Sequence, residues 1–286
     1  MHLVSDFDGV WTDPQPEADY IRRFMAQKLA DTSGLSVDRV EENFAVIEQR
    51  FSAEPFAFGW EFGGRIAAFA GEDLYGRNHA LASCIWSGIQ CPDLDVLKAA
   101  ISKVAGDAQK LADMCFREGR AAFRKLSSTL LVPEAAEVID RLRSANHRLT
   151  IVSNSKVDHI VDLFEDACID LTGVEIVGGA RKFHLGECQQ LPEYLNFNSA
   201  RVALQRPYYF EVLKRLRPDA VIGDVFSLDL ALPMYLRSIG ADFAPSKIAL
   251  LRRQYAPQWV LEITRQDVDV LASLAEVPGW LGSGSL

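Results

Sequence analysis

The hydrophobic residues of this chain follow two patterns, and the change between them divides the sequence. From about residue 17 to 125 apolar side chains recur at helical spacing, as in Val37, Val40 and Phe44, and no segment has a convincing strand pattern. From residue 129 onward short apolar runs alternate with helical patterns. Such continuous runs are typical of strands buried on both faces of a parallel sheet. The pattern therefore predicts an α/β sheet and a separate helical block.

Six short segments are expected to be strands. They are residues 3–4, 149–152, 174–177, 220–222, 241–243 and 259–263. Strands that alternate with helices form parallel sheets with right-handed crossovers, so we expect a doubly wound sheet. Residues 180–205 have no readable pattern, and we predict no structure for them.

Polar side chains follow three of these predicted strands. They are Asp6 and Asp8 after the first, Ser153 and Asn154 after residues 149–152, and Asp224 and Asp229 after residues 220–222. In open α/β sheets the carboxyl ends of the strands are where ligands bind. Of two carboxylates spaced i, i+2, one can attack the substrate or bind a metal while the other transfers protons. An Asp-x-Asp-Gly segment alone is also a common turn, and only the three strand ends together indicate a ligand site.

These motifs together resemble the haloacid dehalogenase superfamily, specifically its phosphohydrolases. The resemblance is carried by Asp6-x-Asp8-Gly9-Val10-x-Thr12-Asp13, by the strand that ends at Ser153-Asn154, by Val132-Pro133 before it, and by Gly223-Asp224-x-x-x-x-Asp229. It covers the first 13 residues and roughly residues 129 to 265. It implies a Rossmann-like core formed by residues 1–13 and 129–286, and an all-helical cap formed by residues 14–128.

The resemblance also implies a Mg²⁺-dependent hydrolase of phosphoric monoesters. Asp6 is the candidate nucleophile, because a carboxylate can form a covalent aspartyl-phosphate. Asp8 would protonate the leaving oxygen and later deprotonate the attacking water. Mg²⁺ suits an all-oxygen site, and we expect Asp6, Asp224 and the backbone carbonyl of Asp8 to bind it. Asp229 would bind the metal through water or orient Asp224.

The phosphoryl group needs further partners, for which four residues are candidates. Ser153 and Asn154 are expected to contact its oxygens. The family places a cation, usually Lys, before a Pro that opens a helix, and here Arg206-Pro207 stands at that position. Arginine can contact carboxylate and phosphate in a bidentate way, so we prefer Arg206 as the catalytic cation and keep Lys182 as the alternative.

Composition narrows the class of partner. Of the 286 residues, 49% are hydrophobic and 24% are charged, which is ordinary for a soluble enzyme. A net charge of −9 argues against a nucleic-acid or anionic-membrane partner. The five cysteines form no Cys-x-x-Cys pair, so we expect neither a zinc site nor disulfides. A small phosphorylated metabolite and a cytoplasmic location are the expectation, and the oligomeric state is not predicted.

The sequence leaves two other functions open. A phosphomutase or phosphotransferase of the same family has the same acids and a similar cap. A catalytically idle relative would keep the fold as a binding protein. The physiological substrate depends on the cap side chains, whose arrangement the sequence does not give.

Overall fold

The computed structural model describes residues 1–126, 130–197, 200–264 and 267–283. The chain folds into two compact units, one of Met1–Asp13 with Thr129–Leu286 and one of Pro14–Ser128. We call the first the core unit and the second the insert. The return to the core between residues 128 and 129 that the sequence predicts lies outside the described residues.

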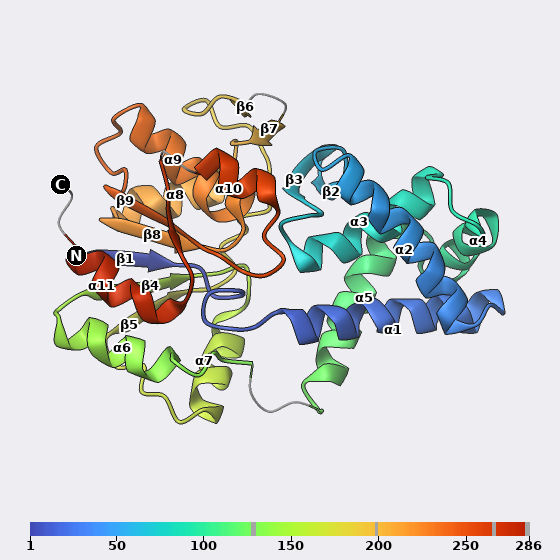
Figure 1. Cartoon of the computed structure of the whole chain (residues 1–286), viewed down its shortest axis with the longest axis horizontal. Coiled ribbons are helices and arrows are strands. Elements are labelled where there is room, and N and C mark those ends of the chain that lie inside the picture. Colours follow the sequence, from blue (N-terminus) through green and yellow to red (C-terminus); the bar gives the residue numbers. More distant parts are fainter. Residues whose placement is uncertain (127–129, 198–199, 265–266, 284–286) are drawn as a thin grey trace. The chain divides into compact units, whose positions relative to one another are not determined.

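The core unit is built on a six-stranded parallel sheet with the order β10-β9-β8-β1-β4-β5 (Figure 1). Its strands are β1 (His2–Ser5), β4 (Arg148–Val152), β5 (Val174–Val177), β8 (Ala220–Gly223), β9 (Lys247–Leu251) and β10 (Asp269–Leu271). The chain proceeds from β1 to β4 and β5 on one side, and then to β8, β9 and β10 on the other. The strand order therefore reverses beside β1, and ligands of open α/β sheets bind at such a point. The predicted fold class is confirmed.

Both faces of this sheet are buried, which explains the continuous apolar runs. Leu3 and Ile151 belong to one cluster with residues of α6 (Ala135–Ser144), α7 (Val157–Asp166) and α11 (Val277–Gly282). The alternate residue Val4 is buried as well. Helices α8 (Pro207–Leu216) and α9 (Ala231–Ser238) lie on the other side of the strands from α6 and α11 (Figure 1).

The last two strands are not where the sequence placed them. The prediction of strands at residues 241–243 and 259–263 was wrong, because the sheet instead continues with β9 and β10, and Gln258–Thr264 is the helix α10. A short apolar run alone does not distinguish a strand from a helix. Proline is favoured where a helix starts, and Pro257 directly precedes α10.

Part of the segment for which no structure was predicted is a hairpin. It consists of β6 (Tyr194–Phe197) and β7 (Ala200–Ala203), which pair antiparallel. The ring of Phe197 packs edge-on against Phe226, with 5.6 Å between the ring centroids. The hairpin thus contacts the segment that follows β8.

In its described residues the insert contains five helices and a second hairpin. The helices are α1 (Gln15–Ser33), α2 (Val37–Ala53), α3 (Leu74–Ser87), α4 (Leu94–Ala105) and α5 (Ala108–Phe123), and the strands are β2 (Gly59–Phe62) and β3 (Arg65–Phe69). The hairpin corrects the expectation of an all-helical insert. Gly63 and Gly64 both have positive φ, which the type I′ form of a two-residue hairpin turn requires.

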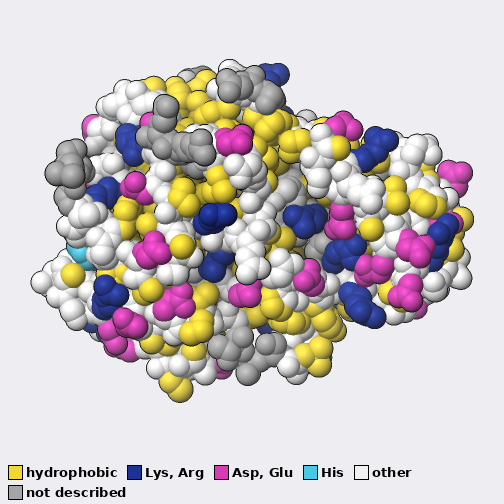
Figure 2. Space-filling view, in the orientation of Figure 1, with side chains coloured by type: hydrophobic (Ala, Val, Ile, Leu, Met, Phe, Trp, Pro, Cys, Tyr) yellow, Lys and Arg dark blue, Asp and Glu magenta, His cyan; other side chains and the backbone are white. Residues whose placement is uncertain are grey.

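Charged side chains of both signs are interspersed on the face of the molecule seen in Figure 2. Within the described ranges, every helix is too short or too polar to cross a lipid bilayer.

Candidate active site at the carboxyl edge of the sheet

Three carboxylates converge at the carboxyl ends of β1 and β8. One oxygen each of Asp6, Asp224 and Asp229 lies within 4.8 Å of the others. Asp6 directly follows β1 and its backbone N–H donates to the Ile222 carbonyl of β8 at 2.9 Å. Asp229 lies on the short π-helical segment η1 (Phe226–Leu230), and its Oδ2 accepts from the Val225 N–H at 3.1 Å. The sheet edge and this turn therefore bring together residues that are far apart in sequence.

The cation in this cluster is Lys182. Its buried ammonium pairs with Oδ1 of Asp6 and with Oδ1 of Asp229, the latter at 2.6 Å. Asn154 Oδ1 accepts from the Lys182 N–H at 2.7 Å, and the guanidinium of Arg206 donates to the Lys182 carbonyl. The preference for Arg206 as the cation against Asp6 was therefore wrong. Arg206 is fully buried and holds the backbone of Lys182 instead.

Sequence reasoning could not rank Lys182 first, because its position depends on loop contacts. The Ala180 N–H donates to the Ser153 carbonyl at 2.8 Å, which fixes the start of the Lys182 segment beside the end of β4. This hydrogen bond lies outside the helices and strands, so no hydrophobic periodicity in the sequence indicates it. The predicted phosphate contacts of Asn154, Lys182 and Arg206 stay predictions.

Burial and mutual repulsion shift the pKa values of the cluster. Burial, and then the carboxylate of Asp229, raise the pKa of Asp6 to about 8, although Lys182 opposes this. Burial and the neighbouring Asp229 and Asp6 raise the pKa of Asp224 well above its usual range. Burial alone would lower the pKa of Lys182, but Asp229 and Asp6 outweigh it, and the pKa is raised. The ammonium of Lys182 therefore does not balance the negative charge of the three carboxylates.

The cluster has the composition of a divalent-metal site. Its donors are all carboxylate oxygens, which hard cations such as Mg²⁺ prefer. Oδ1 of Asp224 is buried and has no hydrogen-bond partner among the described residues. Gly9 has a φ of +83°, and a Cβ at this position would lie 2.0 Å from Oδ2 of Asp224. The residues present therefore fit a metal ion, and glycine is needed for the backbone to approach Asp224 this closely.

Asp8 is held by two hydroxyl groups from the turn that follows β4. Its Oδ2 accepts from Ser155 Oγ at 2.8 Å and from Ser153 Oγ at 3.3 Å. The Ser155 N–H in turn donates to Ser153 Oγ at 2.9 Å. Ser155 was missed in the sequence, where only Ser153 stood at a motif position. The contact of Ser153 with a phosphoryl oxygen, and that of the Asp8 carbonyl with a metal, stay predictions.

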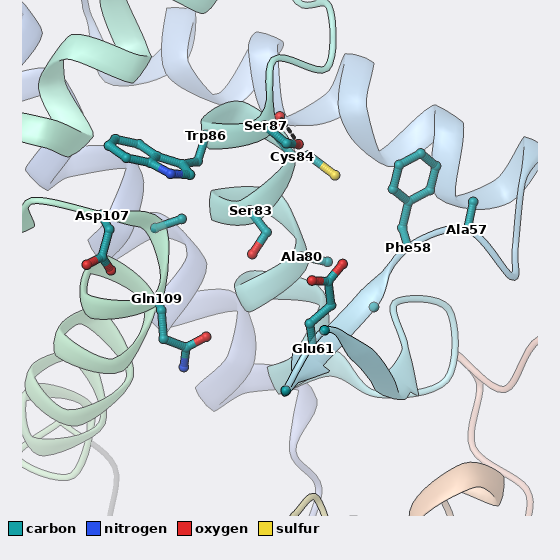
Figure 3. Close-up of a pocket in the computed structure, with 14 residues that line it drawn as sticks. Ala57, Phe58, Glu61, Ala80, Ser83, Cys84, Trp86, Ser87, Asp107 and Gln109 are labelled. Atoms are coloured by element: carbon teal, nitrogen blue, oxygen red, sulfur yellow. Dashed lines mark hydrogen bonds between the residues drawn. The ribbon is translucent and has the colours of Figure 1, made fainter. Parts of the chain in front are cut away.

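A separate pocket of about 530 Å³ lies inside the insert (Figure 3). It is bordered by Glu61, Ser83, Trp86, Asp107 and Gln109, among others. Its lining within the described chain includes no Lys, Arg or His. Because a phosphate dianion would find carboxylates and no countercharge there, this pocket does not suit the phosphate group of a substrate.

Comparison with known proteins gives a match in structure only. No protein-family model and no curated protein matches the sequence. A HAD phosphatase from Thermococcus onnurineus matches with a TM-score of 0.50 and 13% identity, and the match covers 100% of this chain and 99% of that one. This chain has the haloacid dehalogenase fold.

Other solved structures with this fold match over similar lengths. A 2-haloacid dehalogenase from Pseudomonas syringae is 15% identical with a TM-score of 0.45, covering 98% of this chain and 97% of that one. A mutant protein from Rhodobacter sphaeroides in complex with xylulose-1,5-bisphosphate is 12% identical with a TM-score of 0.48, covering 96% and 95%. At 13% identity the match to the Thermococcus onnurineus protein shows the fold alone and does not show the reaction.

Proposed function

We propose that this chain is a Mg²⁺-dependent phosphatase that hydrolyses a small phosphorylated metabolite through an aspartyl-phosphate on Asp6. One arrangement supports this above all others. A candidate nucleophile, a buried ammonium and two further carboxylates meet where the strand order reverses. Catalysis of phosphoryl transfer depends mainly on positioning the nucleophile and on positive charge that stabilises the phosphoryl oxygens.

In the first half-reaction an oxygen of Asp6 attacks phosphorus, and the bond between phosphorus and the leaving oxygen breaks. The carboxylic acid of Asp8 gives its proton to that oxygen, so the product leaves as an alcohol. Ser153 and Ser155 hold the carboxyl group of Asp8 in one orientation for this transfer. Lys182 stays against Asp6 and offsets negative charge as the phosphoryl group arrives.

In the second half-reaction the carboxylate of Asp8 takes a proton from water, and the water oxygen attacks phosphorus. The bond between phosphorus and Asp6 breaks, which restores the Asp6 carboxylate and releases inorganic phosphate. A Mg²⁺ held by Asp6 and Asp224, with Asp229 bound directly or through water, would reduce the repulsion between the carboxylates and the phosphoryl oxygens. Three carboxylates face one ammonium in the cluster, so a phosphate dianion needs this added charge.

The proposal gives the insert the role of the cap. The family resemblance supports this role, since the insert follows the first motif directly. Caps of this kind exclude water and large substrates from the reaction, which favours a small metabolite over a phosphoprotein as substrate.

A panel of small phosphorylated metabolites, each assayed for inorganic phosphate with Mg²⁺ and with EDTA, tests the proposal. We expect release with Mg²⁺ and none after exhaustive EDTA treatment. Asp224→Asn should raise the Mg²⁺ concentration needed for half-maximal release. Asp242→Asn, a core-unit aspartate whose side chain is 79% exposed, should behave like the wild type.

Other outcomes of this panel would contradict the proposal. Isomerisation of a sugar phosphate without phosphate release would indicate a phosphomutase. Binding without turnover would indicate a binding protein. Release that persists after complete metal removal would exclude the role given to Mg²⁺.

A further inference from the structure

Two side chains of the segment between β9 and α10 contact residues of the candidate site. The hydroxyl of Tyr255 donates to Oδ2 of Asp224 at 2.6 Å. The guanidinium of Arg253 donates to the carbonyls of Gly9, Val10 and Thr12, the last two at 3.1 Å. Neither residue lies in a sequence motif, and neither was singled out by its pattern.

Tyr255 makes the two oxygens of Asp224 unequal. Oδ2 already has a hydrogen-bond donor, whereas Oδ1 is buried without a partner among the described residues. Leaving a buried carboxylate oxygen unsatisfied is costly, so this oxygen is suited to a ligand that arrives later. That ligand would be a cation, because the neighbouring groups Asp6 and Asp229 are also carboxylates.

Arg253 acts on Asp224 indirectly, through the Gly9 turn. It holds the turn that starts at Gly9, and the Cα of Gly9 approaches Oδ2 of Asp224 so closely that a Cβ would collide with it. A guanidinium can hold several acceptors at once through its fixed fork of N–H groups, which an ammonium cannot do in the same geometry. Both the Gly9 turn and the Tyr255 hydroxyl therefore lie against Oδ2 of Asp224.

We propose that Tyr255 is a positioning residue of the metal site, which holds Oδ2 of Asp224 so that Oδ1 is presented to the metal. Arg253 supports this by keeping the Gly9 turn against the same carboxylate. The inference rests on the metal site proposed above. Partners that orient a metal-binding carboxylate typically change metal affinity by about 10–100-fold when they are removed.

Direct binding of Mn²⁺ to the substrate-free protein, followed by the electron paramagnetic resonance signal of the free ion, tests this. We expect Tyr255→Phe to bind Mn²⁺ about 10–100-fold more weakly than the wild type, since only the hydroxyl is lost. Tyr235→Phe is the matched control. It also removes only a hydroxyl, but Tyr235 lies on α9 and is not the tyrosine bonded to Asp224, so this variant should bind Mn²⁺ like the wild type. Thermal unfolding in EDTA shows whether Tyr255→Phe is folded.

The kinetics give a second readout that a purely structural role would not move. In Tyr255→Phe the Mg²⁺ concentration for half-maximal activity should rise, while kcat at saturating Mg²⁺ stays within a few-fold of the wild type. Arg253→Lys keeps the charge but not the fork, so it should also weaken Mn²⁺ binding. Wild-type affinity in Arg253→Lys would contradict the part given to Arg253.

The result separates this inference from the proposed function. If the wild type binds Mn²⁺ and Tyr255→Phe binds it equally well, the positioning role is wrong and the metal site stands. If the wild type binds no Mn²⁺, both are wrong.

Discussion

Replacing Lys182 with Met tests how the carboxylate cluster is held together without metal. Methionine keeps most of the side chain's length but removes the charge that pairs with Asp6 and Asp229. Lys182 is only 2% exposed, so water does not screen these pairs, and removing one partner of a buried pair costs about 3–5 kcal/mol. At about 2–4 °C per kcal/mol for a unit of this size, unfolding in EDTA should shift down by roughly 6–20 °C.

Thermal unfolding followed by circular dichroism measures this shift, first in EDTA and then in saturating Mg²⁺. The divalent cation supplies positive charge where the ammonium is missing, so the difference from the wild type should become smaller with Mg²⁺. Lys214→Met, at an exposed position of α8, is the control and should change stability by no more than about 0.5 kcal/mol. If Lys182→Met unfolds in EDTA at the temperature of the wild type, the ion pairs do not hold the cluster and the reasoning is refuted.

Two further predictions concern Gly9 and His79. Gly9→Ala should weaken Mn²⁺ binding at least about tenfold, because the new Cβ would lie 2.0 Å from Oδ2 of Asp224, and wild-type affinity would contradict the close approach. His79 is buried in the insert, its Nδ1 has no hydrogen-bond partner among the described residues, and burial lowers its pKa to about 4, although Asp113 opposes this. Below pH 6.5 the unfolded chain binds a proton that the folded chain does not, so the free energy of unfolding should fall by roughly 3 kcal/mol between pH 6.5 and 4. Urea unfolding at several pH values measures this, and a His79→Phe variant with the same pH dependence as the wild type would assign it to other groups.

The sheet could be predicted because each central strand is an apolar run long enough to be buried on both faces. The runs at β1, β4 and β8 end directly at polar residues, and this placed Asp6, Ser153 and Asp224 at one edge. Prediction failed where the signal was short or ambiguous. The run at 259–263 fits a helix as well as a strand. The Gly63-Gly64 pair, between two aromatic-rich segments, is a hairpin signal inside the block that was expected to be all-helical.

The polar partners of the site were harder to predict than its motif residues. Lys182, Ser155 and Tyr255 reach the carboxylates through irregular segments, so no period of 2.0 or 3.6 residues marks them. The family resemblance favoured Arg206 as the cation, because Arg206 precedes a proline that opens a helix. In the structure that guanidinium donates to the backbone carbonyl of Lys182, and the Lys182 ammonium is the group that pairs with Asp6.

The central claim is that Asp6 is the nucleophile, and trapping the phosphoenzyme tests it most directly. In Asp8→Asn the second half-reaction lacks its base, an effect typically worth about 10²–10⁴-fold, whereas an activated phosphate ester needs little protonation in the first. Phosphoenzyme should therefore accumulate.

The measurement is peptide mass spectrometry of acid-quenched Asp8→Asn after incubation with Mg²⁺ and an activated phosphate ester. We predict one added phosphoryl group on Asp6 in the N-terminal peptide, and none in the double variant that also carries Asp6→Asn. Asp19→Asn, at an exposed acid of α1 outside the motif, should leave turnover unchanged. A phosphoryl group on any residue other than Asp6, or full turnover by Asp6→Asn, would contradict the account.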